Sequence, residues 1–290
     1  MNGIINVLKP PGMTSQDVVS YVKRTLKEKK VGHTGTLDPN ACGVLPICLG
    51  KATKIVDYIM NDKKTYICEL TLGNETDTCD KYGKKLFEYD MNCEIIDYNT
   101  FKSVVESFKG RIKQVPPIFS AVKINGKRAY DLARQGIVPE IKEREVIIYE
   151  INILKYTPPT AIIKICCSKG TYIRSLCRDI GRKLGCRAYM SFLIRTATGK
   201  FSLENSILLT EITPDDISKK MFRADYALDM KSIFVDKKFY TKLMNGNNIS
   251  ISNSLEFLNN EMVKVYIEND LFIAIGKINN NNLFIEKLLV

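Results

Sequence analysis

The sequence predicts an α+β fold with a largely antiparallel sheet. Two observations support this: β-rich runs alternate with helical runs without the regular spacing of βαβ units, and the nucleotide-binding pattern GxGxxG is absent. The chain has 290 residues, about twice the usual size of one domain, and its composition changes after about residue 225. We therefore expect a large domain at 1–228 and a small β-rich domain at 229–290.

The chain is predicted to continue from its first residues into a helix and then a shaped loop. Residues 14–30 have an apolar stripe, and Thr14 with Asp17 forms a capping-box pattern at their start. Residues 31–50 are expected to be irregular backbone of a defined shape. That expectation rests on six residues of turn-forming type: Gly32, Gly35, Pro39, Gly43, Pro46 and Gly50.

The middle of the chain contains short helices and one clear strand. A helix is expected at 52–60, and the alternating run TYICELTL at 65–72 predicts a strand with one apolar face. Residues 99–109 and 128–135 are predicted to be helices that end at a following glycine.

Further along, two β-rich runs at 144–154 and 161–168 predict a hairpin through Pro158-Pro159. Residues 171–184 have the strongest helical pattern, with arginines at every fourth position along one side: Arg174, Arg178 and Arg182. These arginines indicate either a solvated ridge or a surface turned toward phosphates. In the small domain, strands are expected at 262–268, 271–278 and 283–290.

The nine cysteines and the single histidine limit the possible chemistry. No CxxC pair is present, and His33 is the only histidine, so a zinc site is not expected. The cysteines are expected to be free thiols because their number is odd and no secretory signal precedes them. With no signal peptide and no membrane-spanning run, we expect a cytoplasmic protein without a membrane partner.

Basic charge is concentrated in two tracts. Residues 164–200 contain nine Lys/Arg and one acid, a net +8, and residues 102–144 contain ten Lys/Arg and four acids, a net +6. Residues 231–290 contain seven Lys and six acids, a net +1. On charge alone, a nucleic-acid partner and a solvated basic surface are equally good interpretations.

The loop at 32–50, GHTGTLDPNACGVLPICLG, contains the carboxylate of Asp38 between Leu37 and Pro39. Taken alone, an aspartate before a proline is more typical of a turn than of a catalytic site.

The wider motif series favours the catalytic interpretation of Asp38. The chain contains six motifs: KPPGMTS at 9–15, GHTGTLDPNACGVLP at 32–46, KKTY at 63–66, TDTCD at 76–80, PPIFSAVKINGKRAYDLARQG at 116–136 and CSKGTYIRSLCRDIGRKLGC at 167–186. They stand in the same order as in the TruB-type tRNA pseudouridine synthases. Over about residues 1–200, the chain resembles that family.

The resemblance implies a pseudouridine-synthase fold with a PUA-like small domain, and it implies roles for particular residues. Asp38 corresponds to the nucleophile, Arg174 to the arginine that pairs with it, and Tyr66 to the tyrosine that packs against the target base. Tyr172, Leu193 and His33 would lie around the flipped uridine or the adjoining RNA. Lys9, in the KPxG motif, is placed near the substrate and is expected mainly to support the site.

The implied reaction is the isomerisation of uridine to pseudouridine at position 55 of the tRNA T-loop. It exchanges a C–N bond for a C–C bond without net oxidation, so no cofactor is expected. A carboxylate suits a sugar carbon with positive character, and the base must leave the helical stack. Tyr66 is one candidate for the base that removes the C5 proton.

Residues 111–145 correspond to an RNA-gripping insertion of the family. The residues expected to contact RNA there and on the following helix are Lys123, Lys127, Arg128, Arg134 and Arg178. The expected partner is the T-arm of tRNA, with no obligatory protein partner, and a monomer is expected. Two alternatives stay open: a non-catalytic tRNA-binding or tRNA-folding protein on the same fold, and a guide-RNA-dependent synthase.

Overall fold

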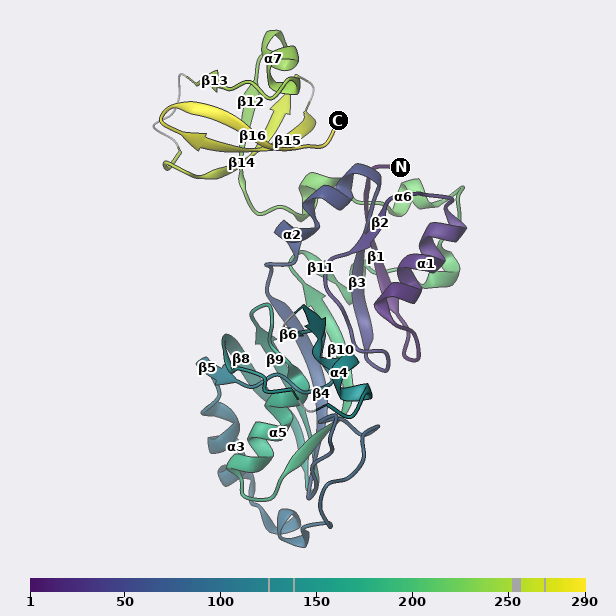
Figure 1. Ribbon diagram of the computed structural model, residues 1–290, viewed down its shortest axis with the longest axis vertical. Helices are drawn as coiled ribbons and strands as arrows, with labels where there is room; N and C mark the ends of the chain where they lie inside the picture. The colour runs from purple at the N-terminus through teal and green to yellow at the C-terminus, as the bar shows by residue number, and fades with distance from the viewer. Residues whose placement is uncertain (125, 138, 252–256, 269) are drawn as a thin grey trace.

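The computed structural model describes residues 1–124, 126–137, 139–251, 257–268 and 270–290. The molecule is elongated: a small β-rich unit, containing both β12 and the C-terminus, lies at one end, and a long sheet runs through the rest (Figure 1). No helix in these ranges is long and apolar enough to cross a membrane.

The main sheet consists, within the described residues, of nine strands: β1 Gly3–Lys9, β2 Val31–His33, β3 Cys42–Leu49, β4 Lys64–Leu72, β5 Gly110–Gln114, β8 Arg144–Thr157, β9 Thr160–Cys167, β10 Ala188–Thr198 and β11 Phe201–Ser202. Their order is β1-β3-β10-β4-β9-β8-β5, with β2 beside β3 and β11 beside β10. The only parallel pairing among them joins β3 to β10, at Cys42–Ile194 and Gly43–Arg195. The predicted mixed, largely antiparallel sheet is confirmed.

The α-helices are short and lie mainly against the main sheet. Their bounds are α1 Ser15–Thr25, α2 Val56–Ile59, α3 Tyr98–Glu106, α4 Ala129–Arg134, α5 Ile173–Lys183, α6 Ile217–Lys220 and α7 Tyr240–Met244. The predicted capping box is present, since the Thr14 hydroxyl accepts from the Asp17 amide and the Asp17 carboxylate accepts from the Thr14 amide. The first helix nevertheless ends at Thr25, five residues before the predicted end at residue 30, because Lys27 has a φ of 51°.

Two apolar clusters lie along the main sheet and place the site between them. Helix α1 packs its valines against β1 and β3, while α3 and α5 cover β4, β8, β9 and β10. The core under α5 contains side chains from its buried stripe together with those of the paired strands: Leu176, Cys177 and Ile180 with Cys68, Leu70 and Ile163. The two halves of the sheet therefore meet where β3 and β10 pair over only two residues.

The prediction of irregular backbone for residues 31–50 is wrong over β2 and β3. Strand β3 has almost no exposed residue, so its apolar side chains do not alternate with polar ones as in a half-buried strand. Gly43 within it has a φ of 112°, and a β-carbon there would collide with the backbone of Arg195. The glycine thus permits the close parallel pairing of β3 with β10.

The small β-rich unit comprises a five-stranded sheet in the described residues, ordered β12-β14-β15-β16-β13. Its strands are β12 Lys231–Val235, β13 Ile249–Ser250, β14 Met262–Ile267, β15 Leu271–Asn279 and β16 Asn282–Leu288. The three strands predicted for this region correspond to β14, β15 and β16. Ile275 and Leu289 share an apolar cluster with Ile4 and Val44, and the Lys54 ammonium donates to the Leu288 carbonyl, so this unit packs on the large one.

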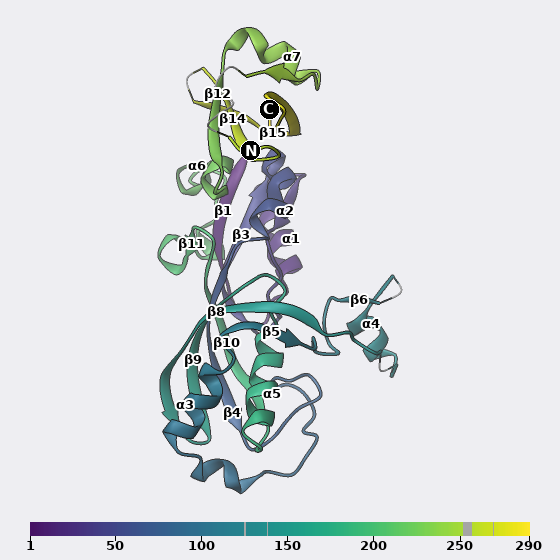
Figure 2. The ribbon, with the colours of Figure 1, turned by 90° about the vertical axis from the view of Figure 1, so that its left-hand side faces the viewer.

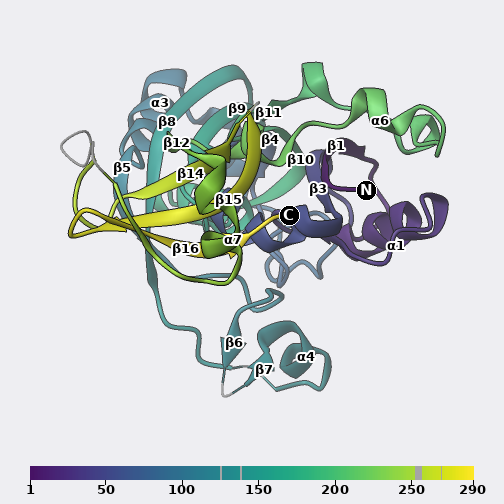
Figure 3. The same cartoon turned by 90° about the horizontal axis from the view of Figure 1, so that it is seen from above.

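A separate projection leaves the main sheet between β5 and β8. It contains α4 and the two-stranded sheet of β6 Lys123–Ile124 and β7 Lys127–Arg128. Figures 2 and 3 show it standing well away from the body of the molecule. Residues 111–114 of the expected insertion belong instead to β5 in the main sheet, so the projection begins after Gln114.

Candidate active site

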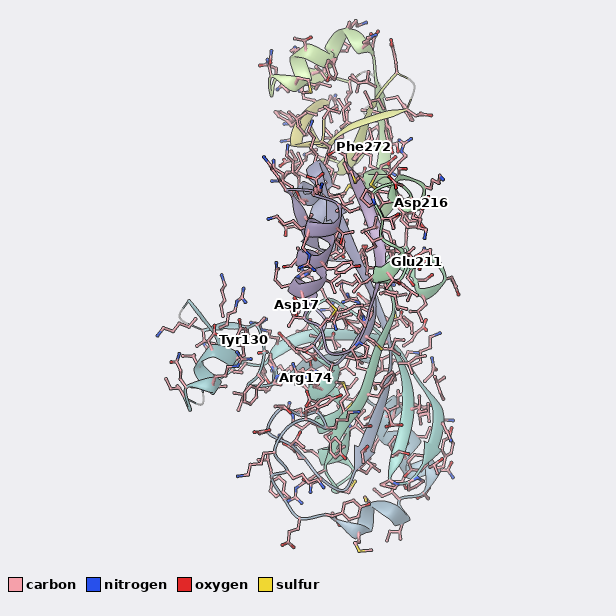
Figure 4. The ribbon with its side chains drawn as sticks, turned by 90° about the vertical axis from the view of Figure 1, so that its right-hand side faces the viewer. Asp17, Tyr130, Arg174, Glu211, Asp216 and Phe272 are labelled. Carbon is pink, nitrogen blue, oxygen red and sulfur yellow. The ribbon has the colours of Figure 1, made fainter. Side chains whose placement is uncertain are left out.

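The site is built around the loop that joins β2 to β3, which carries Asp38. This loop lies at the junction of the two half-sheets, beside the ends of β1, β4 and β10. Figure 4 shows Arg174 below the start of α1, marked by Asp17, and beside the projection, marked by Tyr130. The loop is thus surrounded by strands and helices of the fold, the kind of setting that holds reacting groups in place.

Hydrogen bonds from the segment that follows β1 hold the loop. The Ser15 hydroxyl accepts from the Leu37 amide at 2.8 Å and contacts its carbonyl oxygen at 3.2 Å. The Gly12 amide donates to the Pro39 carbonyl at 3.0 Å. Lys9 is fully buried, and its ammonium donates to the carbonyls of Pro10, Pro39 and Ala41 at 2.8–2.9 Å. The backbone on both sides of Asp38 is therefore fixed.

Arg174, in the first turn of α5, forms a two-pronged ion pair with Asp38. Its Nε and Nη2 atoms lie 2.9 Å from Oδ2 and Oδ1 of the carboxylate. The same guanidinium donates to the carbonyls of Thr78 and Phe119, at 3.1 and 3.0 Å. The side chain of Arg174 is 7% exposed whereas that of Asp38 is 35% exposed. The Asp38 carboxylate is therefore held in one orientation by Arg174 and is still exposed to a substrate.

Tyr66 and Leu193 come from β4 and β10 and lie in the apolar cluster under α5. Tyr66 is 8% exposed and Leu193 is 6% exposed, so only their edges reach the surface. Burial raises the pKa of the Tyr66 phenol, and the Arg195 guanidinium opposes that effect. Tyr172 precedes α5, and burial raises the pKa of its phenol as well. The structure thus brings Asp38, Arg174, Tyr66, Tyr172 and Leu193 to one region.

His33 lies at the end of β2, on the strand that leads into the loop. Its Nδ1 accepts a hydrogen bond from the Gly35 amide at 3.2 Å, so its free proton is on Nε2. Burial, with a smaller contribution from the Arg195 charge, lowers its pKa below 6.5. His33 is therefore neutral at pH 7 and has a single N–H group to offer a partner.

Lys9 and Lys64 are buried cations at the base of the site. The Lys64 ammonium donates to the carbonyls of Met60 and Asp62. Burial is the main cause that lowers the pKa of each lysine from 10.5 to about 8. Since Lys9 has no exposed surface, the structure gives it a loop-holding role and offers no direct contact with a substrate.

The lysine pKa values predict a change of stability with pH. Folded Lys64 loses its proton near pH 8 and unfolded Lys64 near 10.5, so the folded state binds fewer protons between these values. The free energy of unfolding contributed by Lys64 is therefore expected to rise with pH across this window. In denaturant unfolding, the difference in free energy of unfolding between wild type and Lys64→Met should change in favour of wild type from pH 7.5 to 10. The exposed neighbour Lys63→Met should show no such trend, and a flat Lys64→Met difference would contradict the prediction.

Two arginines of the expected ridge on α5, Arg174 and Arg178, are buried, whereas the Arg182 side chain is 58% exposed. Arg178 is 8% exposed, and its guanidinium donates to the Val115 carbonyl at 3.0 Å and to Asp179 at 2.9 Å. Arg182 is held by Glu75 through two bonds of 2.9 and 2.6 Å. The geometry therefore assigns Arg178 to the attachment of the projection and does not present it to phosphates, because segments distant in sequence cover this face of α5.

The other residues predicted to contact RNA are all exposed on the projection: Lys123, Lys127, Arg128 and Arg134. Together with Tyr130 and Asp131 they line an open hollow of about 670 Å³. The Arg128 guanidinium donates to the Tyr130 hydroxyl at 2.9 Å, and that of Arg134 lies 5.5 Å from the centre of the tyrosine ring. This is a basic surface with an aromatic side chain among its cations.

Two residues of the site were not identified from the sequence. Lys64 stands in the sequence as part of the KKTY motif, and Arg195 follows Leu193 by two residues, outside the motif series. Both are charged residues within β-strands, a residue type that is rarely buried. The alternation of apolar residues along β4 places Lys64 on the same face as Tyr66, which was the available signal.

The chain is similar over most of its length to known proteins. The model of the TruB family pseudouridylate synthase N-terminal domain matches residues 23–173, and that of the tRNA pseudouridylate synthase B C-terminal domain matches 174–228. A protein of Clostridium tetani named tRNA pseudouridine synthase B is 49% identical over all of both chains. One of the same name from Alkaliphilus oremlandii is 46% identical over 97% of this chain and 95% of its own.

Among solved structures, a Cbf5-Nop10-Gar1 complex contains a chain that is 25% identical. The match covers 100% of this chain and 85% of that one, with a TM-score of 0.76. A chain of an archaeal box H/ACA Nop10-Cbf5 complex has the same fold, with a TM-score of 0.74, 24% identity, and 100% and 86% coverage. The fold, the motif order and the full-length relatives agree, and the chain belongs to the TruB family of pseudouridylate synthases, which are isomerases.

Proposed function

We propose that this enzyme isomerises one uridine of tRNA, at position 55 in the T-loop, with Asp38 as its nucleophile. The observation that carries the proposal is the ion pair between Arg174 and Asp38, in which the arginine is buried and the carboxylate is open. The tRNA substrate is supported by the names of the full-length relatives, at 46–49% identity. The T-loop position rests on the family resemblance and on the basic projection beside the site.

The chemistry follows from an oriented carboxylate next to a flipped nucleotide. Breaking the N1–C1′ bond leaves positive character at the sugar carbon, which Asp38 would stabilise or bond to covalently. The freed uracil then turns so that its C5 atom meets C1′. The proton at C5 must leave before the ring regains its double bond. Every group needed for these steps belongs to the chain or the substrate.

Tyr66, Leu193 and Tyr172 would form the walls that receive the base outside its stack. Stacking on an aromatic or apolar wall compensates for the unstacking that flipping costs, which is a few kcal/mol. The phenol of Tyr66 belongs to the same strand face as the core and lies near Asp38, as the influence of Asp38 on its pKa indicates. We therefore include Tyr66 as the candidate acceptor of the C5 proton and His33, through Nε2, as a contact for adjoining RNA.

The projection would grip the folded T-arm. Its exposed cations lie on a segment that protrudes from the body containing Asp38. They could therefore contact a part of the folded RNA distant from the target uridine, as in recognition of RNA by its shape. In this proposal the catalytic domain is 1–228 with its RNA-binding insertion at 115–143, and residues 229–290 form a PUA-like domain. The near-neutral charge of that domain predicts weaker RNA contacts, for example to the acceptor stem.

Two other functions are distinguishable from this one. A non-catalytic tRNA-folding protein would have no use for a buried guanidinium aimed at an open carboxylate. A guide-RNA-dependent enzyme would need accessory proteins, such as the Nop10 and Gar1 chains that accompany Cbf5 in its complexes. The projection with its own cations favours direct recognition of tRNA by a chain that acts alone as a monomer.

Tritium release tests the function directly. The enzyme is incubated alone with an unmodified tRNA transcript that carries tritium at uridine C5. We expect stoichiometric release to water, and no release from a transcript in which the T-loop uridine is replaced by cytidine. Tight tRNA binding with no release would leave the folding-protein alternative. Release only after addition of a guide RNA and partner proteins would support the guide-dependent alternative.

The basic hollow on the projection carries its own prediction. The double variant Lys127→Gln/Arg128→Gln should weaken tRNA binding and reduce the slope of log affinity against log salt by about one for each phosphate that is no longer neutralised. Filter binding at several salt concentrations measures both quantities. Lys102→Gln, an exposed lysine on α3 away from the projection, is the control and should leave the slope unchanged. An unchanged slope in the double variant would contradict a phosphate-gripping role.

A further inference from the structure

Arg195 is a buried cation that the proposed reaction does not yet use. It is 1% exposed and is the largest of the fully buried side chains in the described part of the chain. It lies in β10, directly opposite Tyr66 of β4 in the antiparallel register. Since directly opposed residues in such a pair point to the same face, the guanidinium and the phenol are neighbours.

The hydrogen bonds of Arg195 connect the two walls of the site. Its Nε donates to the Val44 carbonyl at 2.7 Å and its Nη2 to the Gly35 carbonyl at 3.1 Å, both in the segment that carries Asp38. Its charge lies near enough to the Tyr66 phenol to oppose the rise that burial causes in the pKa of that group. No carboxylate within the described ranges forms an ion pair with it. A buried guanidinium without a carboxylate is costly, so a compensating charge is expected nearby.

The other cations around this point are Lys9 and Lys64, and neutral His33 lies near them. Lys9, Lys64 and His33 all lie close enough for Arg195 to lower their pKa values, in addition to the larger effect of burial. Around the Tyr66 phenol, the remaining titratable groups are the Cys167 thiol on β9 and the Asp38 carboxylate. Positive groups thus outnumber negative ones and oppose the effect of burial, which still leaves the pKa of the Tyr66 phenol raised.

We propose that Arg195 is a positioning residue that faces the Tyr66 side chain and whose charge favours the phenolate form, so that Tyr66 accepts the C5 proton. The inference rests on the proposed function and deepens it. In this step the C5–H bond breaks and the phenolate oxygen forms an O–H bond. The electron pair of the C5–H bond forms the C5=C6 double bond, and the C6=N1 pair moves to N1, which takes a proton from water. The phenol later returns its proton to water, so the protons balance.

The ionisation of Tyr66 can be measured apart from activity. The full chain is prepared with 3-fluorotyrosine at position 66, and the fluorine chemical shift is followed by NMR as pH is raised. Arg195→Gln keeps amide donors but removes the charge, and we expect it to raise the titration midpoint by about 1 pH unit. Arg195→Lys keeps the charge and should give a smaller rise. Arg111→Gln, at an exposed arginine far from the phenol, should give none.

Single-turnover tritium release on the same variants supplies the second measurement. With Arg195→Gln, release at pH 7 should fall about tenfold for each unit of midpoint shift, and its pH profile should move upward by the same amount. Equal midpoints in all variants, or a loss of release that is the same at every pH, would overturn the proposal and leave Arg195 a structural residue. A shifted midpoint with no release even from wild type would support the Arg195–Tyr66 coupling and overturn the proposed function.

Discussion

Asp38→Asn is expected to abolish tritium release from tRNA, by a factor of at least about 10⁴, while tRNA binding is retained. The amide is nearly the same shape as the carboxylate, but it cannot stabilise or bond to a cationic sugar carbon. Loss of a nucleophile in other enzymes that use one has effects of this order or larger. Binding should survive because the exposed cations of the projection do not depend on Asp38.

Asp80 provides a matched control for this variant. Its carboxylate lies 3.9 Å from Nη1 of the same Arg174 guanidinium, but it lies outside the loop that holds Asp38. Asp80→Asn removes a negative charge from almost the same place, so an effect of charge alone would appear in both variants. We expect Asp80→Asn to keep most of the activity. Equal losses in the two variants would indicate that Asp38 acts only as a counter-charge for Arg174.

The locally periodic elements were predictable because their patterns reflect burial on one face. Strand β4, helix α5 and the hairpin of β8 and β9 each appear within a few residues of the expected bounds. Strands β3 and β10 were not predicted. The first is buried along its whole length, and the second contains polar residues and two register shifts. Their place in the sheet depends on partners far away in the sequence.

The site could be predicted only in part, for a similar reason. The motif series indicated that Asp38 and Arg174 are paired, and the structure brings them together across 136 residues of sequence. The spacing of Arg174, Arg178 and Arg182 predicted a surface ridge, whereas the carbonyls of Val115 and Phe119 cover the first two. A buried arginine is recognised only when the acceptors that surround it are known, which is why Arg195 could not be identified from the sequence.

Arg174→Lys is expected to lower the rate of tritium release roughly 10²–10³-fold at saturating tRNA, with little change in tRNA affinity. Lysine keeps the positive charge but has one ammonium group, which cannot supply two parallel bonds to Asp38 and also reach the carbonyls of Thr78 and Phe119. The carboxylate would then lose its fixed orientation toward the sugar. Losing one well-placed donor in a catalytic site has effects of this size.

Arg182→Lys is the comparison that separates orientation from stability. Arg182 lies on the same helix, two turns further on, and also holds a carboxylate by two bonds, that of Glu75. Both variants should unfold at slightly lower denaturant concentration, because each replaces a paired guanidinium by a less suitable cation. Only Arg174→Lys should lose turnover. If Arg182→Lys lost as much, the effect of Arg174 would be transmitted through the packing of α5, since the second variant leaves the contacts to Asp38 intact.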